Sequence, residues 1–361
     1  MQIHELSTGD KVHRYNKAII VEFIDKRKVL STAHLNGGFR EDLKAILNFD
    51  SNPEDGSTYC QRSDTYEDDL RFIAKELNVD PDKTAAISTT VPMINVSIKS
   101  SIYEDLQVTA IVTAGIDGNA GRVGDPAYFH ERKGEVVVIQ PGTINIILLV
   151  DADLPNGTMT RAIVTATEAK TAALQELQAR SVYSSGLATG TGTDETILIC
   201  NPKSESIMKF AGKHSKLGEL IGITVKEAVS EALDLYAGLT SQKQHSVLRK
   251  IERFGLGRER LADEIKKMVP ESTGLEITSR ISELDNDPEL ISIASLFVHL
   301  MDQLSWGLLS SAEVINECNI LLRRVNPKSI GINTEIKADQ GSLIKKMVDL
   351  FCEGLVTRAS Y

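Results

Sequence analysis

The stretch from Gly142 to Asp194 constrains the fold more than any other part of the sequence. It begins with the continuous apolar run Thr143-Ile-Asn-Ile-Ile-Leu-Leu-Val150, which is typical of a strand buried on both faces. Leu154-Pro155-Asn156-Gly157 ends that strand, and apolar spacing then predicts a helix from about Thr158 to Leu177. A second apolar strand follows at Thr196–Ile199. These elements predict a buried sheet with a helix packed on it.

Two faces of the predicted helix carry different residues. Arg161, Thr165 and Glu168 share one face, so a guanidinium, a hydroxyl and a carboxylate are expected in one line. Glu168 is either a catalytic carboxylate or a surface group paired with Arg161 or Lys170. The packed stripe on the other face is formed by Met159, Ala162, Ile163, Ala166, Ala173, Leu174 and Leu177.

A glycine- and threonine-rich loop, Gly186-Leu-Ala-Thr-Gly-Thr-Gly-Thr-Asp194, connects this helix to the second strand. Its glycines allow the backbone to approach a ligand closely, and its backbone N–H groups can form a nest for an anion or a carbonyl. A plain turn before a buried strand explains the same residues, and Asp194 then caps that turn. The loop is not a P-loop, because no Lys-Ser or Lys-Thr follows the glycines.

A second polar junction is Ser31-Thr-Ala-His-Leu-Asn-Gly-Gly38. Residues 18–31 are predicted to form a hairpin, and the Asn-Gly-Gly turn is predicted to lead into a helix from Glu41 to Asn48. His34 and Asn36 therefore lie where a strand ends, a common position for ligand contacts. For His34, a histidine satisfied by local hydrogen bonds is the competing interpretation.

A third loop, from Thr113 to Pro126, contains Asp117, Asn119, Arg122 and Asp125 among four glycines. The two aspartates could hold a metal ion, but their spacing is not that of an EF-hand and no histidine is close in sequence. No metal site is therefore predicted. His214, just before a helix, is either part of a polar site or an exposed cap residue.

Other segments have ordinary periodicity. A helix is predicted for Tyr66–Leu77, and strands for Ala85–Thr90, Met93–Ile98 and Gln107–Ala114. Thr224 and Glu227 have capping-box spacing, which predicts a helix from Thr224 to about Ala237 after a separate short one.

From about Thr240 the sequence changes to helical segments. These are predicted at 242–254, 258–268, 289–309, 312–325 and 342–355, with Asp287 and Pro288 starting the third. Trp306 is expected to anchor the core of this module.

Bulk properties exclude several classes of protein. The 361 residues suffice for two domains, and the net charge of −10 argues against a nucleic-acid partner. The four cysteines, Cys60, Cys200, Cys318 and Cys352, have neither disulfide-framework nor zinc spacing and are expected to be buried thiols. The sequence shows no signal peptide and no apolar stretch long enough to span a bilayer, so a cytoplasmic protein without a membrane partner is expected.

Taken together, the three loops converge if their strands share one sheet edge. Asn36, Asn119 or Asn145 could then polarise a carbonyl, and His34, Glu168 or Asp194 could activate water. From the residues alone, the pocket either hydrolyses or binds something that carries amides.

At these same residues the chain resembles the adenosylcobinamide amidohydrolase family of corrinoid salvage. The resemblance covers about residues 18–237. The stretches that carry it are Thr32-Ala-His-Leu-Asn-Gly-Gly38, Thr113-Ala-Gly-Ile-Asp-Gly-Asn-Ala-Gly-Arg122, Gly142-Thr-Ile-Asn-Ile146, Ala166-Thr-Glu-Ala-Lys-Thr-Ala-Ala173, Ser185-Gly-Leu-Ala-Thr-Gly-Thr-Gly-Thr-Asp194 and His214-Ser-Lys-Leu-Gly-Glu219.

The resemblance implies hydrolysis of the aminopropanol amide of adenosylcobinamide, giving adenosylcobyric acid and 1-amino-2-propanol. The expected partner is this corrinoid, which itself carries cobalt, and no further cofactor is required. Glu168 or Asp194 is the expected base and His34 the expected acid, with Asn36, Asn145 and the Gly190–Thr193 backbone at the oxyanion. The expected substrate-binding residues are Asn36, Asp117, Asn119, Arg122, Asn145, Thr191, Thr193 and His214.

Two other functions remain open: a non-catalytic corrinoid-binding or transport-accessory protein, and a phosphate- or nucleotide-binding enzyme. The expected fold is α+β, with a mixed, largely buried sheet, or two layered sheets, flanked by helices. The expected domains are residues 1–239, the catalytic part, and 240–361, an all-helical module that could carry a homo-oligomer contact.

Overall fold

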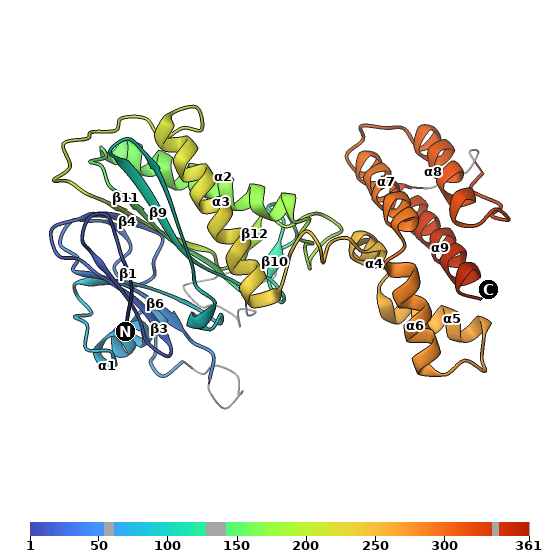
Figure 1. Cartoon of the computed structure of the whole chain (residues 1–361), viewed down its shortest axis with the longest axis horizontal. Coiled ribbons are helices and arrows are strands. Elements are labelled where there is room, and N and C mark those ends of the chain that lie inside the picture. Colours follow the sequence, from blue (N-terminus) through green and yellow to red (C-terminus); the bar gives the residue numbers. More distant parts are fainter. Residues whose placement is uncertain (54–60, 128–141, 334–338, 361) are drawn as a thin grey trace. The chain divides into compact units, whose positions relative to one another are not determined.

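The computed structural model describes residues 1–53, 61–127, 142–333 and 339–360. The chain divides into two compact units, Met1–Thr240 and Ser241–Tyr361. The first contains β-sheets and helices and the second is helical (Figure 1), so the predicted α+β class with a C-terminal helical module is confirmed.

Two large sheets form the first unit. The five-stranded sheet has the order β1-β2-β3-β6-β7, and the six-stranded sheet has the order β5-β4-β13-β11-β9-β8, with β10 and β12 pairing separately. The strands are β1 (Gln2–Glu5), β2 (Lys11–Arg14), β3 (Ala18–Glu22), β4 (Lys28–Ser31), β5 (Gly38–Arg40), β6 (Ala45–Asp50), β7 (Thr84–Thr89), β8 (Ser97–Tyr103), β9 (Leu106–Ala114), β10 (Ala120–Gly121), β11 (Ile144–Val150), β12 (Gly190–Thr191) and β13 (Glu195–Cys200).

The two sheets pack face to face between helical layers (Figure 1). Alternate residues of β11 and β13, such as Ile147 and Ile197, join Ile46 of β6 in the core between the sheets. The opposite face of the six-stranded sheet is covered by α2 (Asn156–Glu176) and α3 (Lys216–Ala237). The helix α1 (Tyr66–Glu76) covers the outer face of the five-stranded sheet.

The stretch that the sequence analysis started from folds as predicted. β11 and β13 pair in parallel and are fully buried, with α2 between them in sequence. Met159, Ala162, Ala166, Ala173 and Leu174 of the predicted stripe lie in the core. The reason is local: one strong period governs each segment, and Pro155 separates them.

Two predictions near the N-terminus, a hairpin and a helix, were wrong. Residues 18–31 do not form a hairpin, because β3 and β4 belong to different sheets. The connection crosses between the sheets with Arg27 buried, and its guanidinium pairs with the buried Asp10, Nε to Oδ2 at 2.7 Å. The predicted helix Glu41–Asn48 is instead β6, which pairs in parallel with β7. Its apolar run satisfies either period, and burial against both neighbouring layers selects the strand.

Smaller differences affect other segments of the first unit. Met93–Asn95 is a 3-10 turn (η1), and the strand that follows runs from Ser97 to Tyr103. α3 is one helix from Lys216, capped by Ser215, so Thr224 does not start it; Thr224 is fully buried in the helix interior.

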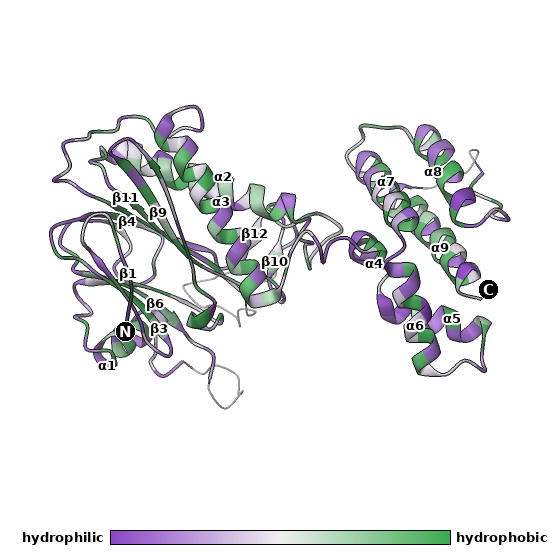
Figure 2. Cartoon of the chain, in the orientation of Figure 1, coloured by the Kyte–Doolittle hydropathy of each residue, from purple (hydrophilic) through white to green (hydrophobic). Residues whose placement is uncertain are grey.

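The second unit is a helical cluster with its own core. Its helices are α4 (Val247–Ile251), followed by a 3-10 turn (η2, Glu252–Phe254), α5 (Arg258–Met268), α6 (Gly274–Asp285), α7 (Pro288–Ser305), α8 (Ser311–Val325) and α9 (Gln340–Ala359). Each long helix carries both hydrophobic and hydrophilic residues (Figure 2). Phe297 and Phe351, both fully buried, meet at its centre with ring centroids 5.0 Å apart.

Three expectations for this unit need correction. The first helix starts at Val247 rather than Gln242. α6 was not predicted, although Thr273 and Glu276 form the capping box that marks its start. Trp306 is 49% exposed and does not anchor the core.

Cys200, Cys318 and Cys352 are buried, and burial raises the pKa of each thiol. Such thiols are poor nucleophiles, as expected. Cys60 lies outside the described residues. Among the helices of the described ranges, none combines the length and apolarity needed to cross a bilayer.

Candidate active site

His34 lies on a segment that is hydrogen-bonded to the edge strand β7. Leu35 is fully buried and forms a β-bridge with Ala86. Asn36 adopts a positive φ of 55°, and at Gly37 a Cβ atom would lie 2.1 Å from the carbonyl oxygen of Ala33. This turn therefore depends on its Asn-Gly sequence, and it fixes the direction in which His34 leaves the backbone.

His34 contacts the carboxylate of Glu195, the first residue of β13. The distance from Nδ1 to Oε1 is 2.7 Å, and the side chains are 60% and 6% exposed, respectively. Glu195 lies on the face of β13 between the sheets, two residues before Ile197. The arrangement is a buried carboxylate that holds an accessible imidazole.

The pair perturbs both ionisations. The hydrogen bond to Glu195 raises the pKa of His34, against a smaller opposing effect of partial burial. Burial raises the pKa of Glu195, while His34 and the backbone N–H groups of Ser88 and His34 oppose that rise. The two groups therefore titrate as a coupled pair.

A chain of buried polar side chains supports this pair from behind. Thr113 accepts from Asn48 (2.9 Å), whose own oxygen accepts from Asn145 (2.9 Å). Asn145 also donates to the carbonyl of Ser88 at 2.9 Å, and the Ser88 hydroxyl meets that of Tyr66. The Tyr66 ring lies edge-on to His34, with centroids 5.0 Å apart. These bonds link β6, β7, β9, β11 and α1 around the histidine.

Two of the predicted oxyanion donors are already committed. Asn36 Nδ2 donates to the carbonyls of Pro81 and Thr84, both at 2.7 Å. Asn145 is fully buried, and its Nδ2 donates to Asn48 and Ser88. The remaining oxygen of each amide is an acceptor and repels an oxyanion. The side-chain N–H groups of both residues are therefore used in hydrogen bonds around His34.

Asp194 lies on the opposite face of the strand from Glu195 and closes the glycine-rich loop. Its carboxylate pairs with Lys170 of α2 and accepts from the Thr191 N–H (3.0 Å), the Thr191 hydroxyl (2.6 Å) and the Ile144 N–H (3.0 Å). A Cβ atom at Gly190 would lie 2.2 Å from Asp194 Oδ2. Asp194 is thus a loop-closing residue and not a free base.

The loop borders a pocket of about 730 Å³, within the range of roughly 300–1,000 Å³ typical of small-molecule sites. Its lining includes Asn119, Arg122, Thr191 and Asp194 from the predicted set, together with Lys170 and Tyr183. Thr193 adjoins it, because its hydroxyl lies 3.4 Å from Asn119 Nδ2. The loops of residues 113–126 and 186–194 therefore do converge.

The other predicted residues lie elsewhere. Glu168 is 41% exposed on α2 and pairs with Lys213 at 3.1 Å and Arg161 at 3.6 Å, and Thr165 is buried with its hydroxyl on the carbonyl of Ala211. Asp117 and His214 are exposed. Among the described residues that line the pocket containing Asp194, His34 and Glu168 are absent, so this pocket does not bring all the predicted catalytic residues together.

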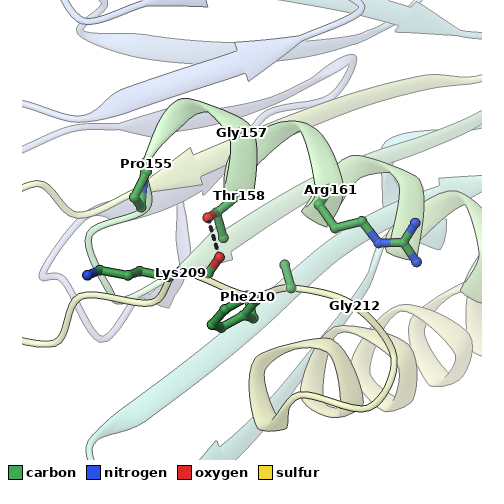
Figure 3. A pocket seen from close by; sticks show the side chains of 8 residues that line it. Pro155, Gly157, Thr158, Arg161, Lys209, Phe210 and Gly212 are labelled. Carbon is green, nitrogen blue, oxygen red and sulfur yellow. Dashed lines mark hydrogen bonds between the residues drawn. The ribbon is translucent and has the colours of Figure 1, made fainter.

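A separate pocket of about 540 Å³ lies at the start of α2. Figure 3 shows the Thr158 hydroxyl donating to the carbonyl of Lys209, at 2.9 Å, beside Phe210. Arg161 extends away from Phe210 (Figure 3). The lining of this pocket contains none of the predicted site residues.

Sequence reasoning missed Glu195, Lys170 and Tyr183. Glu195 is two residues before Ile197 and four before Ile199, so strand alternation places its carboxylate on their buried face. Lys170 falls on the helix stripe of Ala166, Ala173 and Leu174, and a charge on such a stripe signals a buried partner. No comparable signal marks Tyr183.

Among the residues that the structure describes, no three His, Cys, Asp or Glu side chains come together to hold a metal ion. The first unit is thus defined by two stacked sheets between helices, with a carboxylate–imidazole pair and a polar pocket under the glycine-rich loop. The sequence profile of the adenosylcobinamide amidohydrolase family matches residues 3–241, and the chain belongs to this family.

Two curated relatives are similar to this chain. An uncharacterized protein of Methanocaldococcus jannaschii is 36% identical over 228 residues, covering 60% of this chain and 86% of that protein. An adenosylcobinamide amidohydrolase of Methanosarcina mazei is 31% identical over 172 residues, covering 45% of this chain and 74% of the relative.

Among solved structures, the PH0078 protein of Pyrococcus horikoshii aligns with 64% of this chain and 82% of its own, at a TM-score of 0.30 and 11% identity. This likeness is too weak to support a conclusion about fold or function.

Proposed function

We propose that this chain hydrolyses the amide that joins 1-amino-2-propanol to the corrin ring of adenosylcobinamide, releasing adenosylcobyric acid. Membership of the adenosylcobinamide amidohydrolase family supports this substrate class. The cobalt belongs to the substrate, and the reaction requires only water as a second reactant.

The observation that carries the proposal is the exposed imidazole of His34 on a buried carboxylate. Nδ1 is occupied by Glu195, and none of the described residues bonds to Nε2. A histidine in this arrangement can take a proton at Nε2 and give it back within one reaction. Neither Asp194, with its four partners, nor the surface carboxylate of Glu168 offers this.

The proposed reaction uses His34 twice. As the oxygen of water bonds to the amide carbon, Nε2 takes one of the water protons. The C–N bond then breaks, and the imidazolium returns that proton to the departing nitrogen. The acid proton of the new carboxyl group also passes to the amine, so the products are a carboxylate and an ammonium ion. General acid–base catalysis of this kind contributes roughly 10²- to 10⁴-fold.

The pocket under the glycine-rich loop is the proposed binding site for the rim of the corrinoid. Corrin side chains end in amides, which both donate and accept hydrogen bonds. Asn119, Arg122 and Thr191 line the pocket. The N–H groups of Asn119 and the hydroxyl hydrogen of Thr191 are used within the protein, so these two side chains would supply acceptor oxygens and Arg122 the donors. This assignment retains the predicted binding residues that the structure brings together.

The test is product formation by the full chain. Purified protein is incubated with adenosylcobinamide, and 1-amino-2-propanol and adenosylcobyric acid are measured by mass spectrometry. We expect both products in equal amounts. Tight binding of the corrinoid without release of the amine would contradict the proposal and favour a corrinoid-binding protein, and neither binding nor release would exclude both functions.

A further inference from the structure

We propose that Glu195 is the positioning residue of His34: it holds the imidazole through Nδ1–H so that Nε2 is the nitrogen that exchanges protons with substrate. This inference rests on the proposed function, because it concerns the same histidine. Glu195 itself lies behind the imidazole and, in this proposal, does not contact the reacting amide.

The geometry favours a fixed contact over a loose surface ion pair. The Nδ1–Oε1 distance is 2.7 Å, and the Glu195 side chain is only 6% exposed. Its backbone is fixed by the parallel pairing of β13 with β11, where Glu195 lies opposite Asn145. The backbone N–H groups of Ser88 and His34 also favour the charged form of this carboxylate and lower its pKa. A carboxylate held in this way has little freedom to release the imidazole.

The segment that carries His34 is tied to the same strand. The Thr32 N–H donates to the carbonyl of Thr196, and the Thr196 N–H donates to the Thr32 hydroxyl, both at 3.0 Å. The imidazole and its carboxylate are therefore carried by two segments that are bonded to each other directly. A change in one of them moves both groups together, which preserves the pair.

The chemical consequence concerns the tautomer and the charge. A carboxylate at Nδ1 accepts a proton from that nitrogen, so the neutral imidazole keeps its lone pair on Nε2. When Nε2 gains a proton, the same carboxylate stabilises the imidazolium. Among the described residues, the titratable groups that face His34 are Glu195 from β13 and Tyr66 from α1. Burial raises the pKa of Tyr66 to about 12, so it stays neutral and Glu195 supplies the charge.

The test is Glu195→Gln in the full chain, with Glu317→Gln on the exposed surface of α8 as the matched control. His34 is titrated by NMR on ¹⁵N-histidine-labelled protein, with its signal assigned from His34→Gln. In Glu195→Gln, the pKa of His34 should fall, because the charge that raises it is gone. The limb of the pH–rate profile that reports His34 should move to lower pH by the same amount.

Turnover gives the second readout. We expect kcat in Glu195→Gln to fall on the order of 10²-fold or more, with KM changed only a few-fold. Glu195→Asp keeps the charge on a shorter side chain, so the pKa of His34 and kcat should both lie between those of the wild type and Glu195→Gln. If Glu195→Gln does not fold stably, Glu195→Asp still tests the inference through the pKa of His34 and kcat.

An unchanged pKa of His34 in both variants would overturn the inference, and so would a pKa that falls while the pH–rate limb and kcat stay in place. If the wild-type chain does not hydrolyse adenosylcobinamide, the proposed function fails instead. The histidine titration then still decides whether Glu195 governs the protonation of His34.

Discussion

Asp194 and Glu195 are consecutive carboxylates with opposite surroundings. Asp194 meets an ammonium group, a hydroxyl and two backbone N–H groups, which use its accepting capacity to close the glycine-rich loop. Glu195 holds one imidazole whose second nitrogen faces outward. This difference shows that the position of a carboxylate in a glycine-rich loop does not by itself indicate a catalytic role. In the reaction proposed for this chain, the relevant carboxylate is the one that holds an exposed imidazole.

The largest expected effect on stability comes from Asp194. In Asp194→Asn, Lys170 remains 10% exposed without its counter-charge, and breaking such a pair costs about 3–5 kcal/mol. Urea unfolding should show this loss, and Asp194→Asn/Lys170→Met should recover part of it because no buried charge is left. If Asp194→Asn is as stable as the wild type, Asp194 does not hold the loop, and the difference drawn here between Asp194 and Glu195 is wrong.

Gly190 sharpens the same point. Alanine at this position places its Cβ 2.2 Å from Asp194 Oδ2 and 2.8 Å from Lys170 Nζ, and overpacking of this kind costs about 1–3 kcal/mol. Gly157→Ala is the matched control, because nothing lies within 4 Å of its Cβ and it is in the first turn of α2, which begins at Asn156. The midpoint of thermal unfolding should fall in Gly190→Ala and stay level or rise in Gly157→Ala.

The pH dependence of stability tests the other carboxylate. The folded-state pKa values of Glu195 and His34 are both raised, above 4.5 and 6.5, respectively. A raised pKa gives stability that is complete below the unfolded value and is lost as the pH rises through the folded one. The wild type should therefore lose stability relative to Glu195→Gln as the pH rises from about 4.5 through the range in which the folded protein deprotonates Glu195 and His34. The change should be only about 1 kcal/mol, because solvent screens the exposed imidazole.

Urea unfolding of both proteins across this pH range measures the difference. If the difference in free energy of unfolding between the wild type and Glu195→Gln does not change with pH, Glu195 and His34 titrate in the folded protein as they do in the unfolded chain.

The smallest effect is expected from Glu168. Its contacts with Lys213 and Arg161 are at the surface, at 3.1 and 3.6 Å, and such pairs contribute about 1 kcal/mol or less. Glu168→Gln should therefore unfold almost as the wild type does and retain its turnover. A loss of turnover on the scale expected for Glu195→Gln would restore Glu168 as a catalytic candidate.

The outline of the first unit could be predicted wherever one period dominates a segment, as in β11, α2 and β13. β6 could not, because Ala45-Ile-Leu47 fits a helix or a strand until the neighbouring layers are known. The crossing at Arg27 was hidden for a similar reason: its partner Asp10 is remote in sequence.

The candidate site was predictable in part. His34 was singled out from its strand-end position, and Asn119 and Asp194 were correctly expected to come together. Whether the amide donors of Asn36 and Asn145 are free could not be judged from sequence, since the acceptors that occupy them come from other strands. Glu195 was overlooked because its neighbour Asp194 ends the more conspicuous loop.

The most direct test of this account compares His34→Gln with His299→Gln, a histidine exposed on α7. Release of 1-amino-2-propanol from adenosylcobinamide is measured per folded molecule. We expect His34→Gln to lose roughly 10²- to 10⁴-fold in kcat while its fold is retained, and His299→Gln to match the wild type. Turnover by His34→Gln within a few-fold of the wild type would contradict the account.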